Sequence, residues 1–92
     1  MTYLAAVVED DPAERSTLSG YLRRYAETQH LDIEIRTFDR AELLLAGYQP
    51  VYDLIFLDIS LPGINGMDAA ARIRELDHTV TLIFITNLAQ YA

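Results

Sequence analysis

The chain has 92 residues, of which 51% are hydrophobic and 23% charged, so it suits one small globular domain and excludes a disordered segment. Its net charge of −7 argues against nucleic-acid binding by this segment, because contacting phosphates needs a basic surface. It has no cysteine and no apolar run near the roughly 20 residues of a membrane span, so we expect a cytoplasmic protein without disulfides or membrane contact.

The first predicted elements are a strand and a helix. Tyr3 to Val8 is short and continuously apolar, which is typical of a buried strand. A helix follows, because Asp11 can cap its first turn and Pro12 suits the first helical position. We expect it to end near Gln29. Its apolar face, at helical spacing, consists of Leu18, Tyr21, Leu22 and Tyr25.

A second strand and helix come next. Apolar and polar residues alternate from Ile33 to Phe38, which predicts a strand that is more exposed than the first. Asp39 then offers a second helix cap. The following helix should run from Ala41 to Tyr48 and close at Pro50.

Two more strands enclose a third helix. Asp53 to Leu57 predicts a strand buried on both faces, and Ser60 to Gly66 a loop, because it contains proline and glycines. A helix is expected over Met67 to Leu76 and an apolar strand over Val80 to Ile85. The inward positions of that helix are Ala69, Ile73 and Leu76.

The elements therefore alternate as β-α-β-α-β-α-β. This order predicts an α/β fold, with a parallel sheet, right-handed crossovers and helices on both faces. Parallel strands end at one edge of such a sheet. Functional side chains that follow different strands should meet there.

Acidic side chains follow two of these strands. Glu9 and Asp10 come after the first strand, Asp58 ends the third, and Thr86 ends the fourth. Close carboxylates repel one another unless a cation is present, and a hard, oxygen-rich site suits Mg²⁺. Asp58 could then act as a nucleophile toward phosphorus. Taken alone, the acidic group could instead be a solvated turn that caps a helix.

Three separated stretches resemble the receiver domain of two-component response regulators, the CheY-like family. They are Val7 to Asp11, Asp53 to Gly66, and Thr86 at the end of the fourth strand. The resemblance implies a flavodoxin-like, three-layer α/β/α fold with the parallel strand order 2-1-3-4. It also implies a phosphoacceptor signalling domain rather than an enzyme.

The resemblance assigns roles to single residues. Asp58 would accept a phosphoryl group from a sensor histidine kinase. Asp10 and Asp58 would bind Mg²⁺ directly, and Glu9 through water. The backbone carbonyl of Ser60 would be a further metal ligand. The hydroxyl of Thr86 would bind a phosphoryl oxygen and report phosphorylation to the surface.

The last residues resemble a subgroup of this family. Phe84 to Ala92 is similar to the strand-four exit of receivers joined to LytTR-type DNA-binding domains, in which a tyrosine-alanine pair stands where Tyr91 and Ala92 do. The resemblance implies transcription regulation, with DNA bound only through an output domain outside this chain. Asn87 is bulkier than the small residue common in the wider family.

The chain departs from the family at one point. The family has a fifth strand that ends in lysine and then a fifth helix, whereas all seven basic residues here are arginine. We therefore expect residues 1–92 to be a receiver domain truncated before the fifth strand. An exposed edge at strand four and an uncovered sheet face would favour self-association, as a dimer or an exchanged oligomer.

Two rival functions stay open. The first is a protein-interaction or dimerisation module that is not phosphorylated, which the missing lysine favours and the intact acidic residues oppose. The second is an aspartyl-phosphate phosphatase. Such an enzyme usually has a second aspartate two residues after its nucleophile, where Ser60 stands here.

Overall fold

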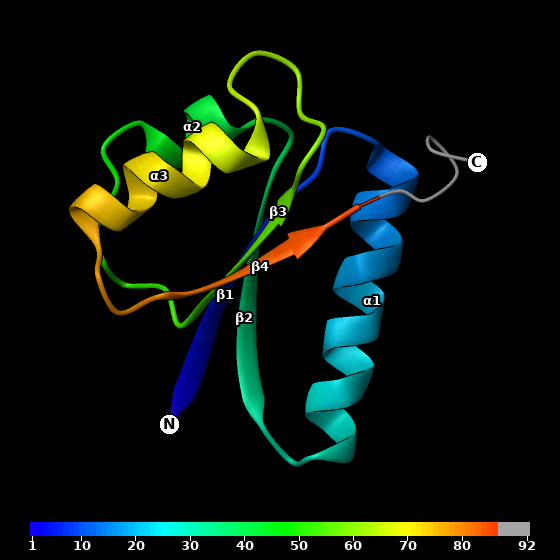
Figure 1. The fold of residues 1–92 in the computed structure, drawn as a ribbon. Helices are drawn as coiled ribbons and strands as arrows, with labels where there is room; N and C mark the ends of the chain where they lie inside the picture. Colours follow the sequence, from blue (N-terminus) through cyan, green and yellow to red (C-terminus); the bar gives the residue numbers. More distant parts are fainter. Residues whose placement is uncertain (87–92) are drawn as a thin grey trace.

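The molecule, described by a computed structural model over residues 1–86, is a parallel sheet between helices. α1 lies on one face and α2 and α3 on the other (Figure 1). The strand order is β2-β1-β3-β4, which confirms the flavodoxin-like α/β/α prediction. Within these residues the elements are β1 (Thr2–Val8), α1 (Pro12–Thr28), β2 (Asp32–Phe38), α2 (Ala41–Leu45), β3 (Leu54–Asp58), α3 (Gly66–Leu76) and β4 (Thr81–Ile85).

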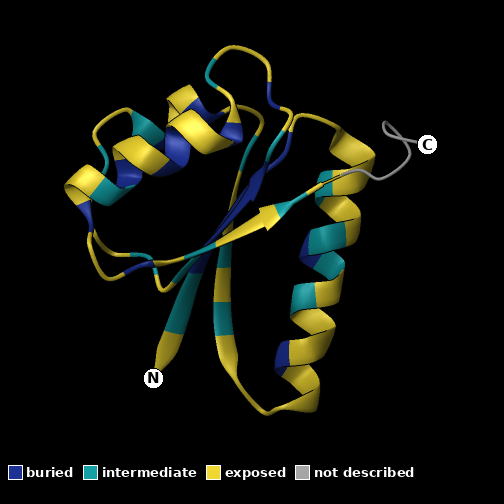
Figure 2. Ribbon diagram, in the orientation of Figure 1, coloured by how far each residue is buried: buried dark blue, intermediate teal, exposed yellow. Residues whose placement is uncertain are grey.

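The core depends on the two central strands, β1 and β3. Their carboxyl-terminal halves are buried, whereas β2 alternates and β4 is largely exposed (Figure 2). The exposed character predicted for β2 is therefore confirmed. The exposed, apolar edge predicted for the fourth strand is confirmed among the described residues, where β4 pairs with β3 alone. Its Ile83 and Phe84 are 36% and 41% exposed. No described helix is long and apolar enough to cross a membrane.

The start of α1 agrees with the sequence, but its buried face does not. The Asp11 carboxylate accepts hydrogen bonds from the backbone N–H groups of Ala13 and Glu14, as a cap should. Tyr21 and Tyr25 were expected inside and are 59% and 62% exposed. The reason is the position of α1 across the sheet. The helix packs over β1 and β2, so Tyr21 and Tyr25 lie beside β3 and β4, where they line surface hollows and stay exposed. The buried residues of α1 are Ser19 and Ala26.

Helix α2 is shorter than predicted. It ends at Leu45 instead of Tyr48, and Gly47 then takes the left-handed conformation with φ of 64°. The predicted cap is also wrong. Arg40 occupies the cap position and makes no side-chain cap hydrogen bond, while Asp39 pairs with the Arg40 side chain at 3.3 Å.

Helix α3 has a side-chain cap at its start, and the predicted burial of one residue at its end is wrong. Asn65 accepts a hydrogen bond from the backbone N–H of Asp68 at 2.9 Å, so the helix begins at Gly66. Its inward residues include Ile73 as predicted, but Leu76 is 56% exposed. The chain turns at the end of α3, where Asp77 is buried instead of Leu76.

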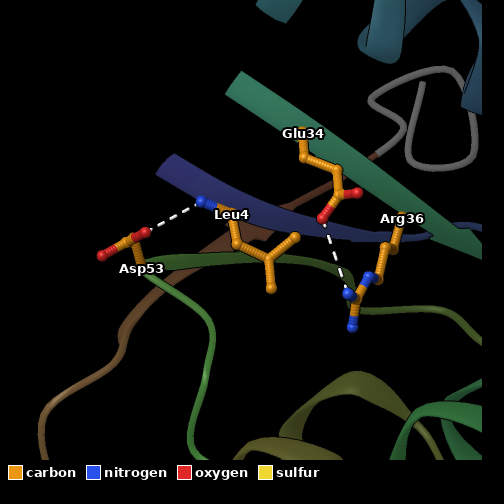
Figure 3. A network of polar contacts seen from close by, with 4 residues as sticks. All are labelled: Leu4, Glu34, Arg36 and Asp53. Carbon is orange, nitrogen blue, oxygen red and sulfur yellow. Dashed lines mark hydrogen bonds and ion pairs between the residues drawn. The ribbon is translucent and has the colours of Figure 1, made fainter. Parts of the chain in front are cut away.

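Asp53 ties together the starts of three strands. Its Oδ2 accepts a hydrogen bond from the Leu4 N–H at 2.8 Å, and its own N–H donates to the Leu4 carbonyl at 2.8 Å. The Thr81 N–H donates to the carbonyl oxygen of Asp53 at 3.3 Å. Figure 3 shows the link to Leu4, with the exposed Glu34–Arg36 ion pair of β2 nearby. Asp53 therefore helps to set the register of β3 between β1 and β4.

A partly buried polar contact joins the α2–β3 connection to the start of β4. The Tyr48 hydroxyl donates to Asp77 Oδ2 at 2.8 Å, and Asp77 Oδ1 accepts from the backbone N–H groups of Thr79 and Val80. Burial would raise the pKa of Asp77, but these hydrogen bonds outweigh it and lower the pKa below its ordinary value. Burial and the Asp77 contact raise the pKa of Tyr48.

We predict that Asp77 makes part of the folding stability depend on pH. Its pKa is lower in the folded than in the unfolded state, so its contribution is present above the unfolded value of about 4 and disappears as the pH falls through the folded value. Tyr48→Phe should cost about 1–2 kcal/mol at pH 7 and weaken this acid dependence. Urea unfolding between pH 7 and pH 3 measures both. Equal profiles for Tyr48→Phe and the control Tyr52→Phe, whose ring stacks on Tyr48, would contradict the prediction.

Candidate functional site

Three carboxylates converge at the carboxyl edge of the sheet. Glu9 and Asp10 follow β1, and Asp58 is the last residue of β3. One oxygen from each lies within 4.8 Å of the others. Glu9 and Asp58 are only 6% and 5% exposed, whereas Asp10 is exposed. The structure thus brings together the three acidic residues that the sequence singled out.

Strand pairing places these residues. Val8 of β1 is opposite Leu57 of β3, so the next residue of each strand, Glu9 and Asp58, reaches the edge at the same level. The Glu9 N–H donates to the Phe38 carbonyl at 3.0 Å, which extends the pairing of β1 with β2 by one step. Parallel register therefore delivers two buried carboxylates side by side.

The electrostatics of the cluster are set mainly by the burial of Glu9. Burial, followed by hydrogen bonds to Asp58 and Asp10, raises the pKa of Glu9 from 4.5 to about 8. The Asp11 N–H, 3.4 Å from Glu9 Oε2, opposes this only in part. Three hard oxygen donors that repel one another fit Mg²⁺, which binds through a few carboxylates and keeps several waters.

The loop after Asp58 is held against the end of β3. Asp58 Oδ1 accepts a hydrogen bond from the Ser60 N–H at 3.0 Å. Gly66 begins α3 so close that an added Cβ would collide with the Asp58 carbonyl oxygen, and its N–H donates to the Ile59 carbonyl at 3.1 Å. Gly63, with φ of 70°, supplies the left-handed turn between them. A side chain at Gly66 would therefore displace the backbone that carries Asp58.

The remaining predicted site residues lie at the same edge. Ile85 is paired with Asp58, and Thr86 follows it as an exposed residue. Thr86 is therefore one residue beyond the register position of Asp58, while its switch role stays a prediction, as does the ligand role of the Ser60 carbonyl. Asn87, Tyr91 and Ala92 lie outside the described residues.

Two residues of this region were missed by sequence reasoning. Gly66 matters through a close backbone approach, for which its position in a glycine-containing loop was the available signal. Arg15 donates from Nη1 to the Glu9 carbonyl at 2.8 Å. The signal for Arg15 was a charged residue four positions before Ser19, on the face of α1 that proved to be buried.

Comparison with known proteins gives a consistent result. The response regulator receiver domain family matches residues 5–92. The sensory transduction protein LytT of Bacillus subtilis is 31% identical over 86 residues, which are 94% of this chain and 34% of LytT. LytR of Staphylococcus saprophyticus is 35% identical over 82 residues, 89% of this chain and 31% of LytR. The chain therefore spans about a third of the length of these curated relatives.

Solved structures agree with the sequence relatives. The response regulator TrrA of Thermotoga maritima, solved in complex with Mg²⁺ and BeF, has a TM-score of 0.79 and 30% identity. The match covers 97% of this chain and 73% of that one. A second structure holds TrrA in complex with the histidine kinase ThkA, with a TM-score of 0.72, 29% identity, and coverage of 91% and 68%.

We predict that Asp58→Asn stabilises the metal-free fold and removes its response to Mg²⁺. The substitution removes one of three repelling carboxylates, while the amide oxygen can still accept from Ser60 N–H. In the unaltered chain, Mg²⁺ at ten times its dissociation constant should add about 1.4 kcal/mol of stability. Thermal unfolding with and without Mg²⁺ measures both effects. Asp32→Asn, at the exposed start of β2, controls for the loss of charge, and an undiminished Mg²⁺ response in Asp58→Asn would refute the assignment.

Proposed function

Because this chain belongs to the response regulator receiver domain family, we propose that Asp58 is the acceptor of a phosphoryl group supplied by a sensor histidine kinase. The observation that carries the proposal is the buried Asp58 carboxylate at the end of β3, grouped with Glu9 and Asp10. Further support comes from TrrA, a related response regulator solved in complex with a histidine kinase. The chain is a receiver signalling domain, and its proposed part is that of a phosphoacceptor rather than an enzyme.

In the proposed reaction a carboxylate oxygen of Asp58 attacks the phosphorus of a phosphohistidine. The new bond joins the Asp58 oxygen to phosphorus, and the bond from phosphorus to the histidine nitrogen breaks. The Ser60 N–H, 3.0 Å from Asp58 Oδ1, would hold the carboxylate in a fixed orientation for attack.

Mg²⁺ is the proposed cofactor. Asp10 and Asp58 would bind it directly, Glu9 through water, and the Ser60 carbonyl would complete the protein ligands. The donor set fits, because the three carboxylates crowd negative charge that a divalent cation would offset. Bound Mg²⁺ would also neutralise charge on the phosphoryl group, which is the main requirement of phosphoryl transfer.

The proposed readout of phosphorylation is Thr86. The support for this role is that Thr86 is exposed and directly follows Ile85, the partner of Asp58 in the sheet. A hydrogen bond from that hydroxyl to a phosphoryl oxygen would favour one of two conformations of the surface near β4.

The proposed setting is transcription regulation. LytR of Staphylococcus aureus, described as a transcriptional regulatory protein, is 30% identical over 88 residues, which are 35% of its length. We infer that residues 1–92 act as the receiver domain of a longer regulator, in which a LytTR-type output domain binds DNA. The acidic receiver itself, with its net charge of −7, would not contact DNA.

We predict that a small-molecule phosphodonor with Mg²⁺ adds the mass of one phosphoryl group to the protein. Asp58→Asn should abolish the gain because it removes the nucleophile, whereas Asp32→Asn, far from the cluster, should keep it. Intact-mass spectrometry reads the outcome. No gain in the full-length regulator would contradict the proposal and favour a module that is not phosphorylated.

A second candidate function, self-association, is favoured by the surface of β4. This edge strand carries no charged side chain, and its Ile83 and Phe84 are 36% and 41% exposed. We predict that light scattering over a concentration series shows a dimer or larger species, and that Phe84→Lys shifts it toward monomer. A clean monomer at high concentration would contradict this, whatever the result of the phosphodonor experiment.

A further inference from the structure

Arg15 occupies an unusual place on α1. It lies four residues before Ser19 and eleven before Ala26, the two buried residues of the helix, so it belongs to the face that packs on the sheet. Its side chain is half-buried. A guanidinium at a position of this kind is costly unless it has a hydrogen-bond partner. That partner is therefore informative about why an arginine stands there.

The partner is the backbone of Glu9. Arg15 Nη1 donates to the Glu9 carbonyl oxygen at 2.8 Å, a charge-assisted hydrogen bond. The N–H of Glu9 donates to the Phe38 carbonyl at 3.0 Å. Both backbone polar groups of Glu9 are thus held by separate elements, α1 and β2. Because Glu9 is only 6% exposed, its carbonyl would lose a needed partner if Arg15 were shortened.

The held backbone carries two members of the acidic cluster. One oxygen from each of Glu9, Asp10 and Asp58 lies within 4.8 Å of the others, so carboxylates that carry negative charge there repel one another. A backbone free to move would let this repulsion separate them. We infer that Arg15 is a positioning residue, which fixes the Glu9 carbonyl so that Glu9 and Asp10 present their carboxylates beside Asp58. The inference rests on the proposed function, because that function gives the cluster its metal.

A purely structural role for Arg15 makes a different prediction. The start of α1 already has its own support, because the Asp11 side chain caps the helix and the Arg15 N–H donates to the Asp11 carbonyl at 2.9 Å. If Arg15 only stabilised the helix, its loss would lower the stability and leave metal affinity in the folded protein unchanged. Metal affinity measured well below the unfolding temperature therefore separates the two roles.

The test compares three variants on the same helix. Arg15→Met removes the donor and keeps an unbranched apolar side chain, and Arg15→Lys keeps a charged donor. Arg23→Met makes the same charge change at an exposed position and is the control. The dissociation constant for Mg²⁺ is read from backbone amide shifts in an NMR titration. We expect Arg15→Met to weaken binding roughly tenfold, as loss of a residue that orients metal ligands usually does, and Arg15→Lys to restore most of the affinity.

Each outcome decides the inference. Equal Mg²⁺ affinities for Arg15→Met and Arg23→Met overturn it, and so does a tenfold loss in both Arg15 variants. If the unaltered chain binds no Mg²⁺, the proposed metal-binding function is contradicted. The positioning role of Arg15 is then tested by a second measurement made without metal. In that measurement, amide hydrogen exchange at Asp10 and Asp11 should be faster in Arg15→Met than in Arg23→Met. Equal exchange rates would overturn the inference.

Discussion

The acidic cluster is the constraint around which this fold is arranged. Glu9 and Asp58 are buried side by side, and burial with mutual hydrogen bonding raises the pKa of Glu9 to about 8. Burying such a group opposes folding, because its charged form loses its hydration. The opposing force is the parallel pairing of β1 with β3, whose buried residues cannot shift register without exposing their apolar side chains. The core thus holds the carboxylates together.

The two faces of the sheet contribute unequally to that core. On the side of α2 and α3, buried residues such as Ile55, Leu57 and Ile73 form one continuous cluster. On the other side, α1 covers β1 and β2 and leaves Phe56 in a hollow of about 440 Å³, bordered by Tyr25. A separate hollow of about 380 Å³, lined by Glu9 and Ile85 among others, lies beside the acidic site on the α1 side of the sheet.

The sequence predicted the parts of this structure that depend on local pattern. Continuous apolar runs gave the buried strands, Asp11 gave the cap of α1, and strand order brought Glu9 and Asp58 to one edge. It failed where the answer depends on how elements lie across one another. Periodicity indicates that Tyr21 and Tyr25 share a helix face, but not which strands that face covers, so their exposure could not be foreseen.

The same reasoning explains why Gly66 and Arg15 were missed. Each acts through a close contact with backbone that appears only when the chain is folded: Gly66 allows α3 to approach the Asp58 carbonyl, and Arg15 holds the Glu9 carbonyl. Both therefore support the strand ends from outside the cluster, one at β3 and one at β1. Carboxylates that repel cannot position one another. Their arrangement has to come from neighbouring backbone, so the residues that shape this site include some with no acidic group at all.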